Sequence, residues 1–396
     1  ICMAEMINDK LTNGHFKNCY YRQTSDINLS GTAFEPIGNN TVFAGNYDGD
    51  HHIISGMNVN SSAGYAGLFG KVGEPDNPIK LSEISNLVVY GNVDSSDSYA
   101  GGIAGMISYN TNIYQCGFYG DITSTEDTGG IAGRIEKGGV ISSCYHNGTV
   151  NGSTAGGIVG QIIKSTDAGY DSFIVSSYHH NGKANGSTTG GICGYIDYVE
   201  NSQGIISLYN NFYEKGSATY GIGNGESSDA RAVNHTVISA IGETLGAPFK
   251  DHEDTSRNNG CPVFVWELPM YKFSGAGTPD NPYLISSKEE LVQLSEYLND
   301  SVYSTIFNKA SYQQTTDIDL KGVSWKPMSG NRTAGFNGSY DGACHTIDNL
   351  TVSNDRFGGL FGYVSVGTVK NLVINNGSIT AKSNAGGITA QLGNKL

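Results

Sequence analysis

The sequence is poor in charged residues, which make up 15% of its 396 positions, and 37 acidic residues outnumber 23 basic ones. A net charge of −14 repels phosphate backbones and anionic lipid headgroups, so we expect no nucleic-acid partner. No apolar run approaches the roughly 18 residues of a membrane span, and no signal peptide is present. We therefore expect no membrane insertion, and we expect residue 1 not to be the native start.

Proline and cysteine are also scarce. The 9 prolines beside 55 glycines disfavour low-complexity disorder, and the 7 cysteines include no C-x-x-C pair, which excludes a zinc knuckle and a redox dithiol. The odd number leaves at least one thiol unpaired within the chain. Gly, Asn, Ser, Thr and Tyr are abundant, and this composition favours short strands separated by many turns.

A phrase of the form Gly-Gly-Ile-x-Gly recurs roughly every thirty residues. Its copies occupy residues 101–105, 129–133, 156–160 and 190–194, flanked by degenerate copies at 67–70 and 220–223. Each repeat is too short to bury a core alone, so we expect the repeats to stack as coils about 4.8 Å apart. Ile103, Ile131, Ile158 and Ile192 should then form one inward column.

A second phrase lies between the glycine signals. Residues 144–148 read Cys-Tyr-His-Asn-Gly, and residues 178–182 read Tyr-His-His-Asn-Gly. Aligning the two Asn-Gly pairs places Tyr178 where Cys144 stood and brings His146 close to His180 of the next coil. An upstream copy begins at Cys116, since Cys116 precedes Ile122 by the same distance as Cys144 precedes Val150.

A longer period of close to three hundred residues shows two related modules. Residues 24–31 return at 315–322, and residues 47–52 return at 340–345. Residues 3–9 align with residues 294–300, where the second copy has a helical pattern starting at Lys288, with Ser286 or Ser287 as N-cap. We expect this helix to cover one end of the stack and the chain to begin inside its first copy.

These patterns predict an all-β fold: a right-handed parallel β-helix, or solenoid, with a short capping helix, followed by the start of a second similar module. The first module should span residues 1–270, with its N-terminal cap truncated and a closing segment at about 236–270. The second should span residues 271–396 and stop within a repeat. The boundary falls near 271–278, where Gly275, Gly277 and Pro279 interrupt any regular element.

The repeats resemble the bacterial GLUG motif, named for its Gly-Leu-x-Gly signature, which occurs here at residues 67–70 and 359–362 and, with Ile for Leu, in the Gly-Gly-Ile series. The opening residues 26–29 and 47–54 and the closing residues 259–266 are similar to the ends of such modules. The resemblance implies a large bacterial surface or secreted protein, adhesin-like or the non-catalytic part of an immunoglobulin A peptidase. It implies no catalytic residues.

Candidate metal sites can be weighed against simpler readings. Residues 251–254, Asp-His-Glu-Asp, lack the His-Glu-x-x-His spacing of a zinc peptidase, which favours a polar loop. Residues 48–52, Asp-Gly-Asp-His-His, could hold a cation, but the second copy keeps only the Asp-Gly turn and His345, which favours a turn with a structural histidine. His146, His179 and His180 could hold a metal, or flank an exposed Asn-Gly corner, which we favour.

Cys116 and Cys144 should be neighbours in one column, either as buried thiols or as a disulfide; disulfide torsions seldom suit adjacent parallel strands, so we favour thiols. A carbohydrate-active enzyme needs carboxylates converging on a groove. The charged residues of the repeats fall at predicted turns without recurrence: Asp121, Glu126, Asp127, Arg134, Glu136 and Lys137. Five tyrosines could stack on sugars or simply build strands: Tyr99, Tyr109, Tyr119, Tyr170 and Tyr195.

We therefore predict a non-catalytic, adhesin-like module of a bacterial cell-surface or secreted protein, within a larger multidomain chain. It would bind a host or environmental glycan or an extracellular protein, or act as a stiff spacer. We assign no catalytic, cofactor-binding or metal-binding residue and expect no cofactor. The alternative is a carbohydrate-active β-helix enzyme, either a polysaccharide lyase or a glycoside hydrolase.

Overall fold

A computed structural model describes residues 2–9, 13–39, 41–62, 64–73, 80–96, 99–225, 227–252, 254–268, 273–300, 303–330, 335–354 and 356–393. The chain divides into two compact units, Ile1–Glu267 (unit 1) and Leu268–Leu396 (unit 2). Part of the predicted boundary, residues 271 and 272, lies outside the described residues. The fold is mostly β with a few short helices, and the large sheets are entirely parallel.

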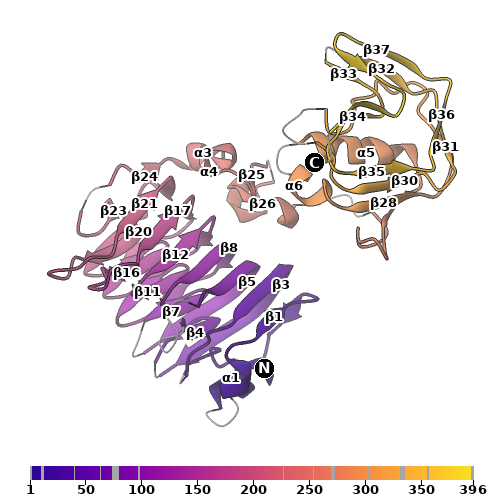
Figure 1. Cartoon of the computed structure of the whole chain (residues 1–396). Helices are drawn as coiled ribbons and strands as arrows, with labels where there is room; N and C mark the ends of the chain where they lie inside the picture. The colour runs from indigo at the N-terminus through magenta and orange to yellow at the C-terminus, as the bar shows by residue number, and fades with distance from the viewer. Residues whose placement is uncertain are drawn as a thin grey trace. The chain divides into compact units, whose positions relative to one another are not determined.

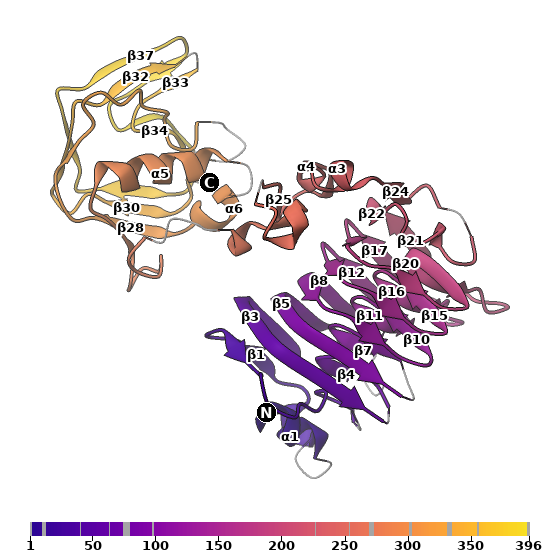
Figure 2. The ribbon, with the colours of Figure 1, turned by 180° about the vertical axis from the view of Figure 1, so that it is seen from behind.

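Two parallel sheets build unit 1 (Figures 1 and 2). The first sheet contains β1 (Tyr20–Arg22), β2 (Ile27–Asn28), β3 (Asn46–Ser61), β5 (Ser82–Ser95), β8 (Thr111–Tyr119), β9 (Ile122–Thr123), β12 (Gly139–Ser142), β13 (Tyr145–Asn147), β14 (Val150–Asn151), β17 (Ser172–Val175), β18 (Tyr178–His180), β19 (Ala184–Asn185), β21 (Ile206–Tyr209), β22 (Asn211–Glu214) and β24 (Ala230–Val233). The second contains β4 (Phe69–Val72), β6 (Ala100–Gly101), β7 (Ala104–Ser108), β10 (Asp127–Gly129), β11 (Ala132–Glu136), β15 (Thr154–Gly156), β16 (Val159–Ile163), β20 (Thr188–Asp197) and β23 (Tyr220–Ile222).

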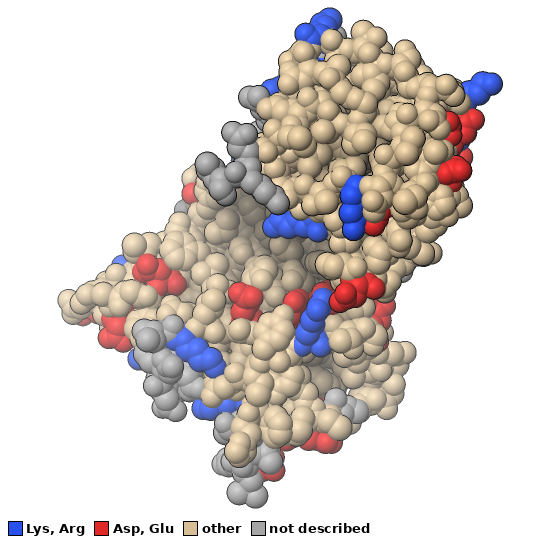
Figure 3. Space-filling view, turned by 45° about the vertical axis from the view of Figure 1, so that its right-hand side comes forward, with Lys and Arg blue, Asp and Glu red and all other residues tan. Residues whose placement is uncertain are grey.

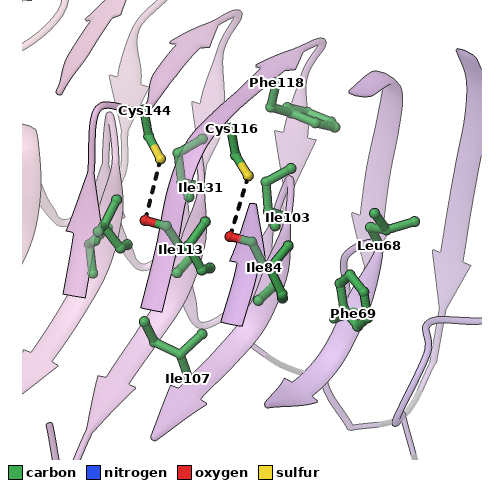
Figure 4. Packing of buried hydrophobic residues seen from close by; sticks show 14 of the residues in the cluster. Leu68, Phe69, Ile84, Ile103, Ile107, Ile113, Cys116, Phe118, Ile131 and Cys144 are labelled. Carbon is green, nitrogen blue, oxygen red and sulfur yellow. Dashed lines mark hydrogen bonds between the residues drawn. The ribbon is translucent and has the colours of Figure 1, made fainter. Parts of the chain in front are cut away.

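Successive repeats stack in register, as in a solenoid. Each Gly-Gly-Ile phrase pairs with the same phrase of the next repeat: Gly101 with Gly129, Gly129 with Gly156, and Gly156 with Gly190. The four isoleucines are fully buried, and backbone hydrogen bonds of 2.9–3.0 Å join each to the next, from Ile103 through Ile131 and Ile158 to Ile192. The predicted isoleucine column is therefore confirmed, and part of it is visible in Figure 4.

The second glycine of each phrase leaves room for an aromatic ring inside the coil. A Cβ at any of these positions would overlap a ring from the first sheet. The pairs are Gly102 with Phe118, Gly130 with His146, Gly157 with His179, and Gly191 with Tyr213. These rings form one column across adjacent coils, because Phe118 pairs with His146, His146 with His179, and His179 with Tyr213. Bare Cα atoms thus let flat rings fill the narrow interior.

Short helices close the start of unit 1. These are α1 (Cys2–Asn8) and α2 (Asn13–Phe16). Ala4 and Ile7 of α1 are buried in the main core cluster, together with Phe34 and Phe43. The helix therefore shields apolar side chains that would otherwise meet water.

The closing segment of unit 1, residues 235–267, crosses the outer face of the first sheet, and we call it the strap. It comprises α3 (His235–Ile238), α4 (Gly242–Leu245), β25 (Phe249–Lys250), η1 (Asn258–Gly260), β26 (Val263–Phe264) and η2 (Val265–Glu267). β25 and β26 form an antiparallel pair. Strap side chains such as Phe249 and Phe264 pack on outward rings of the coils, among them Tyr145 and Tyr178. At the end of the strap, the centroid of the Trp266 ring lies 5.4 Å from the centroid of the His51 ring in β3.

Unit 2 repeats the opening of unit 1. Its elements are β27 (Tyr283–Ile285), α5 (Lys288–Asn299), α6 (Tyr303–Phe307), β28 (Ser311–Gln314), β29 (Ile318–Asp319), β30 (Ser339–Asp341), β31 (Thr346–Asp348), β32 (Thr351–Asn354), β33 (Phe357–Gly358), β34 (Phe361–Val364), β35 (Thr368–Lys370), β36 (Val373–Asn375), β37 (Ser378–Ala381), β38 (Asn384–Ala385) and β39 (Thr389–Leu392). Equivalent hydrogen bonds recur: Tyr47 Oη donates to Gln23 in unit 1, and Tyr340 Oη donates to Gln314 in unit 2.

The predicted helix of unit 2 is α5, and its N-cap is Ser287. The Ser287 hydroxyl accepts a hydrogen bond from Glu290 N (3.1 Å), and the Glu290 carboxylate accepts one from the Ser286 hydroxyl (2.8 Å). This reciprocal pattern satisfies donors that a helix start leaves unpaired. Leu291, Leu294 and Leu298 point into the core of unit 2, so α5 covers that core as expected.

Candidate functional site

A cleft of about 360 Å³ opens between the strap and the outer face of the first sheet. It is lined by Tyr90, Tyr119, Asn147, Ser256, Arg257, Asn258 and Asn259. Tyr90 of β5 and Tyr119 of β8 pair in register, and their rings stack in parallel with centroids 4.4 Å apart. The coils therefore supply one wall of this strap cleft, and residues 256–259 supply the other.

A strained turn forms the strap wall. Asn258, Asn259 and Gly260 have φ values of +48°, +52° and +76°, the left-handed region that costs energy for residues other than glycine. The buried Asn258 side chain holds the turn: Oδ1 accepts from Asn147 Nδ2 (2.9 Å) and His180 Nε2 (2.8 Å), and Nδ2 donates to Tyr178 Oη (2.8 Å). These contacts with two coils fix the turn in position.

Arg257 supplies the cation of the strap cleft. Its Nη1 donates to the backbone carbonyl of Glu267, which anchors one end of the guanidinium. Its Nε is buried and makes no hydrogen bond to a described residue, and Asp254 Oδ2 lies 4.0 Å from it as a long ion pair. The side chain is 34% exposed. The strap therefore orients the guanidinium, and part of the side chain stays exposed at the cleft.

Behind the strap cleft lies a buried carboxyl group. The oxygens of Glu267 are each 2.8 Å from the Tyr145 hydroxyl, and Oε1 accepts from Phe264 N (2.8 Å). Burial raises the pKa of Glu267 to about 7. The Tyr145 hydroxyl is also 3.1 Å from the hydroxyl of Tyr119, which lines the cleft. Glu267 itself does not line the cleft.

The buried histidines correct two of our expectations. His146 pairs with His179, not with His180, and Asn147 pairs with His180. The expected register was wrong because the later coil has one extra residue, which is absorbed at the corner, where Asn181 has φ +56°. Tyr178 consequently stands opposite Tyr145 rather than Cys144. The three imidazoles are fully buried, and His180 directly precedes the corner at Asn181, which is exposed.

The histidine pair forms part of the interior ring column. His146 Nε2 donates to Gly120 O (3.0 Å), and the two Nδ1 atoms of His146 and His179 are 3.1 Å apart, a hydrogen bond between stacked rings. Burial lowers the pKa of His146 and of His180 to about 4, so both are neutral near pH 7. Within the described part of the chain, no three His, Cys, Asp or Glu residues gather as metal ligands.

The Asp48–His52 segment makes structural contacts. Asp48 accepts hydrogen bonds from Tyr20 Oη (3.0 Å) and Asn86 Nδ2 (3.0 Å). Asp50 pairs with Arg22 at 2.8 Å. His52 Nδ1 is 3.2 Å from Asp26 Oδ1, and the equivalent His345 Nδ1 in unit 2 is 3.3 Å from Asp317 Oδ1. The recurrence of this contact in both units is what a structural role for the histidine requires.

Residues 251–254 belong to the strap. Asp251 Oδ1 accepts from Gly242 N (2.7 Å), and His252 Nε2 contacts Cys261 O (2.9 Å). Asp254 caps its own turn by accepting from Ser256 N (3.0 Å). Glu253 lies outside the described residues. These contacts hold the strap's own loop together.

The two predicted column cysteines, Cys116 and Cys144, are buried free thiols in neighbouring coils. Cys116 Sγ donates to Ile84 O (3.7 Å) and Cys144 Sγ to Ile113 O (3.6 Å), each a carbonyl of the preceding coil (Figure 4). Burial raises the pKa of Cys116 well above its usual value. Both thiols therefore serve as small core side chains.

The charged residues that the sequence placed at turns are partly in strands. Asp127 lies in β10, and Arg134 and Glu136 lie in β11. The sharp bend between these strands brings them together: Arg134 Nε donates to Asp127 Oδ2 (2.6 Å), and Nη1 donates to Glu136 Oε1 (3.2 Å). The Arg134 guanidinium also lies 3.7 Å from the Tyr99 ring centroid. These groups satisfy one another.

The remaining predicted residues lie apart. Tyr109 and Tyr170 meet edge to face at 6.0 Å, with Lys137 5.5 Å above Tyr109. Tyr195 pairs with Gln161 on the second sheet. Asp121 Oδ1 accepts from Thr149 N (2.7 Å), and Glu126 is exposed. Of the five singled-out tyrosines, only Tyr119 lines the strap cleft.

Charge is spread rather than gathered on the face shown in Figure 3, where acidic and basic side chains lie interspersed among neutral ones. Among the described residues, no helix has the length and hydropathy to cross a bilayer.

Sequence reasoning did not find Tyr90, Arg257, Asn258 or Glu267. The only signal was the Asn-Asn-Gly run of the strap, which is typical of left-handed turns.

Comparisons with known proteins place the chain only broadly. No protein-family profile matches it. A stretch of 121 residues is 36% identical to Halomucin of Haloquadratum walsbyi; the match covers 29% of this chain and 1% of that protein. A crystal structure of a candidate immunoglobulin A1 protease from Bacteroides ovatus matches 62% of this chain and 86% of its own, at 21% identity and a TM-score of 0.45.

Proposed function

We propose that this chain is a non-catalytic, adhesin-like module of a bacterial cell-surface or secreted protein, built as a right-handed parallel β-helix of GLUG type. Its ligand, a glycan or an extracellular protein, binds in the strap cleft. The distant similarity to Halomucin supports an extracellular location. The in-register coils provide the rigid support on which a binding site is most effective.

The observation that carries the proposal is the make-up of the strap cleft. Its lining offers phenols, amides, a hydroxyl and one guanidinium, which are groups that bind polar ligands. None of its described lining residues carries a carboxylate, and catalysis of glycoside cleavage needs titratable groups that reach the substrate. Glu267 has the raised pKa of a general acid, but it is buried and does not line the cleft.

An array of glycans and extracellular-matrix proteins tests the proposal, with cleavage products monitored in parallel. We expect binding without cleavage, reduced by Tyr119→Ala and unchanged by Lys137→Gln, which alters an exposed cation away from the strap cleft. Saccharide cleavage that Glu267→Gln abolishes would instead establish the carbohydrate-active enzyme. Absence of any binding would leave the module as a spacer.

A further inference from the structure

We propose that the strap cleft binds a pyranose that carries a carboxylate, as in the uronic or sialic acids of glycans. This inference rests on the proposed function and names the ligand class of the same site. It depends on three observations: a partly exposed arginine, described lining residues that carry no acidic group, and a fixed turn that presents amides beside two phenols.

The charge of the strap cleft differs from that of the chain. Arg257 is the positively charged member of the seven described lining residues, and the other six are Tyr, Asn and Ser. The whole chain, in contrast, has a net charge of −14. Asp254, 52% exposed, lies 4.0 Å from Arg257 Nε and accepts a hydrogen bond from the hydroxyl of the lining residue Ser256 (2.6 Å). The exposed part of the Arg257 side chain lines the strap cleft, where a ligand carboxylate can form a charge-assisted contact with it.

The other lining groups suit the hydroxyls and ring of a sugar. Asn147, Ser256 and Asn259 place amides and a hydroxyl on the cleft wall. Ser256 Oγ donates to Asp254 Oδ1 and Asn147 Nδ2 to Asn258 Oδ1, so each meets a ligand with its remaining hydrogen-bonding capacity. Tyr90 and Tyr119 offer apolar ring surface with hydroxyls at the edge, a combination that suits the two chemical faces of a pyranose. A volume of about 360 Å³ accommodates a sugar ring rather than a folded protein surface.

Pre-organisation strengthens the argument. The left-handed turn at residues 258–260 is held by hydrogen bonds to Asn147, Tyr178 and His180 of the coils. The ligand thus meets a wall that is already ordered, which lowers the entropy cost of binding.

Saturation-transfer NMR on the full chain tests the inference with matched probes: methyl β-D-glucuronide, its methyl ester, methyl β-D-glucoside and the methyl glycoside of N-acetylneuraminic acid. We expect one or both acids to bind and the ester and glucoside to bind at least about tenfold more weakly, since a charge-assisted contact is lost. Stronger binding of the glucuronide would identify a uronic acid as the ligand, and stronger binding of the N-acetylneuraminic acid glycoside would identify a sialic acid.

Two variants separate binding from folding. Arg257→Gln should weaken binding of the acid about tenfold, and Asn259→Asp, which keeps a residue that tolerates left-handed backbone, should weaken it by adding a like charge. Lys137→Gln should have no effect. Equal binding of glucuronide and glucoside, insensitive to both variants, would overturn this inference and leave a glycan-binding function intact. If none of the four sugar probes binds, this inference is overturned as well. If no glycan or matrix protein of the array binds, the proposed binding function is itself wrong.

Discussion

Gly102 offers a stringent test of how the interior is packed. An added Cβ would lie 2.5 and 2.6 Å from Cδ1 and Cδ2 of Phe118, a fully buried ring that stacks 5.9 Å from His146. Overpacking of this kind costs about 1–3 kcal/mol, and we place Gly102→Ala at about 3 kcal/mol because the column of rings leaves the Phe118 side chain nowhere to move. Gly225→Ala is the matched control, since no atom lies within 4 Å of its added Cβ.

Guanidinium unfolding followed by fluorescence measures the effect, with Trp266 reporting on unit 1 and Trp325 on unit 2. Gly225→Ala should change stability by less than about 0.5 kcal/mol. Phe118→Leu should partly rescue Gly102→Ala, with a coupling free energy of about 1–2 kcal/mol in a double-mutant cycle. The reasoning fails if Gly102→Ala behaves like the control or if the cycle shows no coupling.

Three further predictions concern buried groups. The pKa values of His146 and His180 fall from 6.5 to about 4 on folding, so the unfolded state binds more protons than the folded state between these pH values. The free energy of unfolding should therefore drop as pH falls from 6.5 to 4, by up to about 3 kcal/mol per histidine, and denaturation at a series of pH values measures this. Glu267 has the opposite sign: its pKa rises from 4.5 to about 7, so its contribution is lost as pH rises from 4.5 to 7, and Glu267→Gln should remove this dependence and stabilise unit 1 at pH 8. Native thiol labelling should modify exposed Cys2 and Cys344 and spare Cys116 and Cys144 until unfolding; rapid modification of the latter pair would contradict their burial.

Local repetition explains why the coils could be predicted. The Gly-Gly-Ile phrases repeat because each coil needs the same tight bend and the same inward Ile, so sequence spacing carries the register directly. The N-cap of α5 was predictable because Ser287 and Glu290 are three residues apart and satisfy the helix start by themselves.

The register at the histidines and the strap cleft could not be predicted in this way. The later coil has one extra residue at the corner that contains Asn181, and the strand before this corner keeps its pairing with the preceding coil. The sequence alone does not show whether an extra residue is absorbed at a corner or shifts the pairing of a strand. Tyr90 and Arg257 belong to elements distant in the chain and follow no period, so only the path of the strap across the sheet brings them together. The burial of Glu267 depends on the same path.

Stacking of the glycine-punctuated repeats underlies the entire account, and methyl NMR measures it most directly. In a sample labelled at isoleucine methyl groups, we predict cross-peaks linking Ile103 with Ile131, Ile131 with Ile158, and Ile158 with Ile192, because neighbouring coils are about 4.8 Å apart. We predict none between Ile103 and Ile192, three coils apart. A missing link between successive isoleucines, or direct contact between Ile103 and Ile192, would contradict the stacked arrangement.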